Sequence, residues 1–137
     1  VDRGDERIVA ALSTQLEDKP PGVRSTALYA LSELAERGQE SAVAVVIACL
    51  EDKDEAVRLA AVKAMAEVGR RGNARVVAAL SARLEDVDAR VRYAAVGGLA
   101  QVAQKGDTCA IAAVSACLED EVAWVRYAAV EALTEVA

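Results

Sequence analysis

The chain has 137 residues and a formal net charge of −6, and its composition is 54% hydrophobic but only 3% aromatic. The negative charge argues against a nucleic-acid-binding protein, because neutralising phosphates requires clustered lysine and arginine. Charged residues interrupt every apolar segment, so we expect neither insertion into a membrane nor a signal peptide. A composition rich in alanine, valine and leucine, without phenylalanine, favours closely packed helices over strands.

The sequence repeats every 34 residues, four times over. The tripeptide Leu-Glu-Asp recurs at 16–18, 50–52, 84–86 and 118–120, and Val-Arg follows it in constant register at 23–24, 57–58, 91–92 and 125–126. A period of this length indicates stacked supersecondary units, which form an extended surface rather than a catalytic pocket. We assign one array over 1–137, with repeats at 4–37, 38–71, 72–105 and 106–137. Both ends fall in the phase of a repeat, so we interpret the chain as a piece of a longer array.

Each repeat is expected to begin with a helix that follows a glycine. The glycine supplies a left-handed residue after the preceding helix, and the next residue caps the new helix; these caps are Asp5, Gln39, Asn73 and Asp107. Apolar residues then recur at spacings of three and four, which places them on one helix face. The predicted buried stripe is Val9, Leu12, Leu16; Val43, Val46, Leu50; Val77, Leu80, Leu84; and Ile111, Val114, Leu118.

A second helix follows a short turn in each repeat. Asp54 and Asp88 are suitable caps for it, and the first repeat has Pro20-Pro21, which fits a first helical turn. The expected buried residues are Val23, Ala27, Ala30, Leu31, Leu34 and their equivalents. Ala27 is alanine in all four repeats, which allows neighbouring helices to approach closely. Two helices per repeat without strands predict an all-α fold, an α-solenoid.

The three cysteines are expected to be free thiols. Cys49 and Cys117 occupy the same repeat position two units apart, and Cys109 and Cys117 are separated by about 12 Å along one predicted helix. Unpaired cysteines indicate a reducing intracellular compartment, most simply the cytoplasm, with the plastid stroma as the alternative. The sequence contains no histidine and no Cys-x-x-Cys pair, so no metal or other cofactor is expected.

The segment Leu-Glu-Asp-Val-Asp-Ala-Arg-Val-Arg-Tyr-Ala-Ala-Val at 84–96 resembles the short HEAT repeat, also called phycobilisome-lyase-like. The signatures of tetratricopeptide and ankyrin repeats are absent. The resemblance covers essentially the whole chain and implies a right-handed α-solenoid of antiparallel helix pairs. It also implies a hydrogen-bonded ladder between repeats, built from an aspartate and the arginine six residues later. The matching pairs are Asp18 and Arg24, Asp52 and Arg58, Asp86 and Arg92, and Asp120 and Arg126.

One stripe on the second helices points away from the predicted core, and in HEAT-like arrays this face lines a concave groove. All three tyrosines and the single tryptophan lie on it. Such side chains often anchor protein interfaces. We therefore predict a partner-binding patch made of Leu59, Arg90, Tyr93, Trp124 and Tyr127, with Tyr29 further along the stripe. Two other interpretations stay open: the aromatic residues are repeat consensus without a ligand, or they pack against the next repeat.

Two further features concern the same stripe. Gly97-Gly98 interrupts the second helix of the third repeat, and it either opens a dent beside Tyr93, lets the array flex, or is tolerated drift. The third repeat has five basic and three acidic residues, whereas the fourth has one basic and six acidic residues. This change of sign either orients a partner along the groove or reflects ordinary solvated helix faces.

Catalysis is not expected. A HEAT-like deoxyhypusine hydroxylase needs His-Glu pairs for iron, and a HEAT-like DNA glycosylase needs a basic groove, whereas Glu33, Glu67, Glu131 and Glu135 lie on the stripe. The sequence therefore predicts a non-catalytic scaffold or adaptor that binds a protein partner. The alternatives are a phycobilin-lyase-like component of photosynthetic assembly and an engineered HEAT-like binder. End-to-end contact with adjacent repeats is a further expected mode of association.

Overall fold

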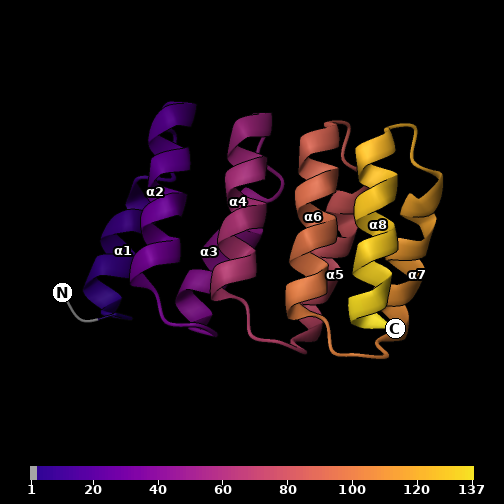
Figure 1. Cartoon of the computed structure of the whole chain (residues 1–137). Coiled ribbons are helices and arrows are strands. Elements are labelled where there is room, and N and C mark those ends of the chain that lie inside the picture. The colour runs from indigo at the N-terminus through magenta and orange to yellow at the C-terminus, as the bar shows by residue number, and fades with distance from the viewer. Residues whose placement is uncertain (1–2) are drawn as a thin grey trace. The chain divides into compact units, whose positions relative to one another are not determined.

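The computed structural model describes residues 3–137, and the helices of Figure 1 account for most of them. Among these residues there are eight α-helices, two short 3₁₀ helices and no strand. The helices are α1 (Glu6–Thr14), α2 (Pro21–Leu34), α3 (Glu40–Cys49), α4 (Glu55–Val68), α5 (Ala74–Ala82), η1 (Arg83–Glu85), α6 (Ala89–Val102), α7 (Thr108–Ala116), η2 (Cys117–Glu119) and α8 (Ala123–Val136). The all-helical prediction is confirmed.

The chain forms two compact units, an N-terminal unit that ends at Gly69 and a C-terminal unit over Arg70–Ala137. In the N-terminal unit α2 packs against α4, and the shorter helices α1 and α3 pack behind them. The C-terminal unit has the same design, with α6 against α8 and with α5 and α7 behind (Figure 1). Each unit therefore presents a pair of long second helices, 14 residues each, as one of its faces.

The core of each unit is aliphatic. The repeated alanine is buried at all four positions, Ala27, Ala61, Ala95 and Ala129, which permits the close approach of α2 to α4 and of α6 to α8. No aromatic side chain is buried among residues 3–137. The aromatic residues are exposed because they lie on the helix faces that point away from this aliphatic core.

Two predictions of burial are wrong. Val23 is 39% exposed, whereas its equivalent Val57 is fully buried, because α2 lies beside Val57 and no second helix precedes α2 in the described chain. Leu118 is 38% exposed, whereas its equivalents Leu50 and Leu84 are buried. The periodic pattern identifies the apolar face of a helix, but burial also requires a neighbouring helix on that side.

The repeat glycines have positive φ values of 80° to 86°, as predicted, but they do not terminate helices. The helix α2 ends at Leu34, and the next residue, Ala35, is extended. Gly38 lies in the following turn, which is closed by a hydrogen bond from the Gln39 amide to the Glu36 carbonyl at 3.0 Å. The Gly38 amide also donates to the carbonyl of Val68 at 2.6 Å, at the end of α4. Through this hydrogen bond, Gly38 connects the turn before α3 to the end of α4, the second helix of its own repeat.

Most of the predicted helix caps are present. Asp5, Asn73 and Asp107 each accept a backbone N–H of the helix that follows, as do Asp54 and Asp88. The prediction for Gln39 is wrong, since its side chain caps no helix. Its amide group donates instead to the Gly4 carbonyl at 2.9 Å and to Glu6 Oε2 at 2.8 Å. The additional methylene of glutamine is unsuitable for the short return to the helix amides that asparagine makes.

Candidate functional site

Three of the predicted partner-binding residues come together in the C-terminal unit. Tyr93 extends from α6, and Trp124 and Tyr127 extend from the first half of α8. The rings of Tyr93 and Trp124 meet edge to face, with centroids 5.4 Å apart and planes at 75°. This is a favourable geometry for two aromatic quadrupoles, and it links two helices that belong to different repeats. All three residues line an open hollow of about 660 Å³, the aromatic hollow.

The rest of the aromatic hollow is built from small and polar residues. Gly97 and Gln101 line it from α6, and Glu131 and Glu135 line it from the last two turns of α8. Arg71, which precedes α5, also lines it and donates from Nη1 to the Ala103 carbonyl at 2.7 Å. The lining is therefore aromatic toward the start of α8 and acidic toward its end.

Gly97 keeps the aromatic hollow open. A Cβ atom built on this residue would have no atom within 4 Å apart from its chain neighbours and the backbone of its own helix, so packing does not require glycine here. Glycine in a helix interior costs about 0.5–1 kcal/mol relative to alanine. The residues at the same repeat position are Tyr29, Lys63 and Glu131, all of which have large side chains. The absence of a side chain at 97 therefore has its main consequence in the shape of the hollow.

The aromatic side chains are only partly engaged by the protein itself. Tyr127 is 67% exposed, Tyr93 50% and Trp124 45%. The contact between Tyr93 and Trp124 matches the interpretation in which these rings pack against a neighbouring repeat, but it leaves about half of each side chain accessible. The rings are thus held in place and still present apolar surface to solvent, which is the arrangement of a preorganised contact surface.

The remaining residues of the predicted patch do not line the hollow. Arg90, in the first turn of α6, is exposed and forms an ion pair from Nη2 to Asp88 Oδ2 at 3.0 Å. This hydrogen-bonded arginine lowers the pKa of Asp88. Tyr29 on α2 and Leu59 on α4 belong to the N-terminal unit, where Tyr29 is exposed and Leu59 is half-buried. The structure therefore brings together three of the six predicted residues.

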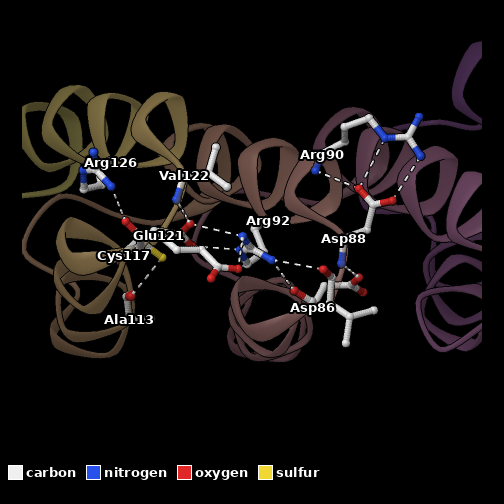
Figure 2. Close-up of polar contacts among 11 residues, drawn as sticks. Asp86, Asp88, Arg90, Arg92, Ala113, Cys117, Glu121, Val122 and Arg126 are labelled. Carbon is white, nitrogen blue, oxygen red and sulfur yellow. Dashed lines mark hydrogen bonds and ion pairs between the residues drawn. The ribbon is translucent and has the colours of Figure 1, made fainter.

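The ladder arginine of the third repeat connects α6 to the segment before α8 (Figure 2). Arg92 donates from Nε to Asp120 Oδ2 at 2.8 Å and from Nη2 to Asp120 Oδ1 at 3.1 Å. Its Nη1 donates to the Asp86 carbonyl at 2.8 Å. Asp120 Oδ1 accepts the Val122 amide at 2.9 Å, directly before α8. Arg92 precedes Tyr93 in the sequence and Val122 is two residues before Trp124, so this bidentate pair joins the two backbone segments from which the rings extend.

The N-terminal unit contains the corresponding pair. Arg24 donates from Nε to Asp52 Oδ2 and from Nη2 to Asp52 Oδ1, both at 2.9 Å. Asp52 Oδ1 accepts the Asp54 amide at 2.9 Å, and its carbonyl accepts Arg58 Nη1 at 2.8 Å. In the last repeat Arg126 Nη1 likewise donates to the Asp120 carbonyl at 2.6 Å. Arg24 and Arg92 thus bond to a backbone carbonyl beside their own repeat's aspartate, and the carboxylate that each of them binds comes from the next repeat.

Asp18 departs from this pattern. It has a positive φ of 46° and no hydrogen-bond or ion-pair partner in the described chain, and Arg24 donates to the Lys19 carbonyl instead. Asp52, Asp86 and Asp120 each accept the amide two residues later. The residue two positions after Asp18 is Pro20, which has no N–H to donate. The proline pair therefore removes the bond that orients the other ladder aspartates.

The pKa values of Asp52 and Asp120 are lowered. For Asp120 the main cause is the hydrogen bond from Arg92. For Asp52 burial opposes the shift, but the hydrogen bonds from Arg24 and the Asp54 amide outweigh it, so the pKa lies below its ordinary value. Both carboxylates are therefore ionised at neutral pH and are fully engaged in structural bonds, which leaves them unavailable for catalysis.

The two buried cysteines are not reactive thiols. All three are free, with Cys49 and Cys117 buried and Cys109 exposed. Burial raises the pKa of the Cys49 thiol to about 11, and it also raises the pKa of Cys117, so both remain protonated at neutral pH. A protonated thiol is a poor nucleophile and a poor metal ligand. In residues 3–137 no three His, Cys, Asp or Glu side chains are grouped so as to hold a metal ion.

Sequence reasoning found the aromatic residues of the hollow but not its full lining. Gln101, Glu131 and Glu135 lie on the predicted stripe, yet nothing in their spacing separates them from the equivalent polar residues of the other repeats. Arg71 precedes a helix and has no periodic signal at all. Only the packing of α6 against α8 selects these residues from the stripe.

The sequence profile of HEAT repeats matches residues 9–100 and 77–137, which together cover most of the chain. The chain belongs to the HEAT-repeat family. Its structure is similar to the crystal structure of an engineered protein, with a TM-score of 0.71 and 22% identity. The match covers 93% of this chain and 62% of the engineered protein, and at this identity it shows a shared helical solenoid fold. No curated protein sequence matches the chain.

HEAT repeats generally mediate protein–protein interaction. None of the helices within residues 3–137 combines the length and the apolar character that crossing a membrane would require.

Proposed function

We propose that this HEAT-repeat protein is a non-catalytic scaffold that binds a segment of a partner protein on the face of its second helices. The aromatic hollow of the C-terminal unit is the anchoring point, with Tyr93, Trp124 and Tyr127 as the main contacts. Arg90, Tyr29 and Leu59 form secondary contacts elsewhere on the same helix faces. The observation that supports this proposal is a half-exposed aromatic cluster around an open hollow, in a chain whose core contains no aromatic residue.

The physical argument rests on preorganisation. Tyrosine and tryptophan bury a large area on binding while losing few rotatable bonds, and they dominate interface energetics. Here the edge-to-face contact of Tyr93 with Trp124 and the Arg92–Asp120 pair already restrict the rings in the free protein. These side chains would therefore lose little further conformational entropy when a partner segment binds.

The charges of the aromatic hollow do not favour the pigment-handling alternative. A bilin carries propionate groups, which need cationic partners. The hollow contains the carboxylates of Glu131 and Glu135, and its single arginine, Arg71, already donates to a backbone carbonyl. Electrostatics thus support a peptide partner over an anionic pigment.

Selection from a displayed random-peptide library tests the proposal. The intact chain would be compared with Gly97→Tyr, which fills the hollow with the residue that the first repeat has at this position. Lys63→Tyr introduces the same side chain on α4 and is the matched control. We expect enriched peptides to lose binding to Gly97→Tyr and to a Tyr93→Ser, Trp124→Ser, Tyr127→Ser variant, and to keep it with Lys63→Tyr. Peptides that bind all variants equally would overturn the assignment of the hollow.

A further inference from the structure

We propose that the aromatic hollow is selective for an arginine side chain, presented by a basic segment of the partner. This inference rests on the proposed function and adds the chemistry of the residue that is recognised. Three observations support it: the excess of carboxylates in the lining, the partly exposed aromatic side chains beside them, and the space above Gly97.

The lining has an excess of negative charge. Glu131 and Glu135 line the aromatic hollow against the single guanidinium of Arg71. Neither glutamate has an ion-pair partner among the described residues. Glu135 lies in the last turn of α8, where the partial negative charge of the helix end disfavours a carboxylate. A bound cation would relieve both unfavourable effects, whereas a bound carboxylate would intensify them.

The aromatic end of the hollow fits the same ligand. Cations are attracted to the faces of tryptophan and tyrosine, with tryptophan the strongest partner. Because the rings of Tyr93 and Trp124 meet edge to face, they present differently oriented surfaces to the space between α6 and α8. A side chain with its stem against these rings and its charged group toward Glu131 would follow the lining from its aromatic end to its acidic end.

Arginine matches an open hollow better than lysine does. Its guanidinium is planar, stacks on aromatic faces, bonds a carboxylate through two N–H groups and is more weakly hydrated than an ammonium group. Partial transfer from water into a half-exposed site is therefore less costly for arginine. Gly97 leaves room for such a planar group, since no atom beyond its own stretch of helix backbone lies within 4 Å of where its Cβ would be.

Trp124 provides a direct reading of occupancy, because it is the only tryptophan in the chain. The probes are three capped peptides, acetyl-Gly-Leu-Xaa-Leu-Gly-amide, in which Xaa is arginine, lysine or citrulline. Titration of the full chain with each peptide, followed by tryptophan emission, should give the order arginine, lysine, citrulline. We expect arginine to bind about fivefold more tightly than citrulline, which has a similar shape and no charge. Raising the ionic strength from about 0.1 to 1 M should weaken only the two cationic peptides.

The carboxylates are tested by a Glu131→Gln, Glu135→Gln variant, which should weaken the arginine peptide about threefold to fivefold and leave citrulline unchanged. A Glu33→Gln, Glu67→Gln variant removes the same charge from α2 and α4 and is the matched control. Circular dichroism verifies that both variants keep the helical content of the parent.

The outcomes distinguish this inference from the proposed function. Equal binding of arginine and citrulline peptides, lost in Gly97→Tyr, would overturn the selectivity for arginine and leave peptide binding in the hollow intact. No response to any of the three peptides up to roughly 5 mM would also overturn the arginine site. The library selection would then decide separately whether the hollow binds peptides of other composition.

Discussion

The two units share their framework and differ on their exposed face. Residues of the C-terminal unit correspond to residues 68 positions earlier, two repeats back. In both units a bidentate arginine–aspartate pair connects one long helix to the segment before the next, and the repeated alanine of each long helix is buried. On the exposed face the equivalents of Tyr93 and Trp124 are Ser25 and Ala56, and the equivalent of Gly97 is Tyr29.

This comparison separates structural positions from variable ones. Ala27 and Ala95 are equivalent, and both must be small because a helix packs directly on them. Ser25 and Tyr93 are also equivalent, but their side chains differ greatly in size and chemistry, so the fold tolerates different residues at this position. A repeat protein is free to change its exposed stripe without changing its framework, so differences between units at the stripe are the informative ones.

The largest expected effect comes from breaking the shared framework. Arg92→Met should lower the free energy of unfolding by roughly 3 kcal/mol, because it leaves the carboxylate of Asp120 partly buried without its partner. Arg126→Met is the control, since Arg126 has the same repeat position but no carboxylate partner within residues 3–137. Urea denaturation would compare the two. Equal losses would show that packing of the arginine stem, and not the ion pair, gives the stability.

Acid should weaken both units in the same way. The pKa values of Asp52 and Asp120 are lower in the folded protein than in the unfolded chain, so the unfolded chain takes up protons first as the pH falls. The stabilisation is therefore fully present above about pH 5, starts to be lost near the unfolded aspartate value of about 3.9, and disappears below the folded values. Urea denaturation at a series of pH values measures this, and Asp120→Asn should flatten the dependence. An unchanged slope in that variant would contradict the pKa shift of Asp120.

Gly97→Ala should stabilise the protein by about 0.5–1 kcal/mol, because alanine favours the helix and the new methyl group enters open space. Gly22→Ala is the control in the N-terminal unit, where a Cβ also meets nothing but the residue lies in the first turn of α2, so we expect a smaller gain. Thermal unfolding followed by circular dichroism would detect both. A loss of stability in Gly97→Ala would mean that the backbone is more closely packed than the structure shows.

The smallest expected effect is the coupling between the two rings that only the C-terminal unit has. A double-mutant cycle with Tyr93→Ala and Trp124→Ala should give a coupling energy of about 0.5 kcal/mol, at the lower end for aromatic pairs because both rings are half exposed. Tyr93→Ala combined with Val130→Ala should be additive, since Val130 is exposed on α8 and does not line the hollow. Additivity in both cycles would show that the ring contact is fortuitous.

Sequence by itself determined the framework of this protein. The spacing of Leu16, Val23 and Ala27 and their repetition every 34 residues predicted two helices per repeat, and capping residues such as Asp54 and Asp88 marked where the second helices begin. These features are local or periodic, and a helix depends on hydrogen bonds within one segment. The family resemblance likewise required only residues at fixed spacing.

Tertiary structure alone decided which positions have a neighbour. Val23 and Val57 occupy the same repeat position, yet Val23 is exposed and Val57 is buried, because burial depends on whether another helix lies beside the residue. Packing of α6 against α8 also placed Tyr93 in contact with Trp124 and gathered Glu131 and Arg71 around the same hollow. From the sequence, each of these residues can be assigned only to its own helix or turn. Only the contact between helices, which no local pattern encodes, makes them one site.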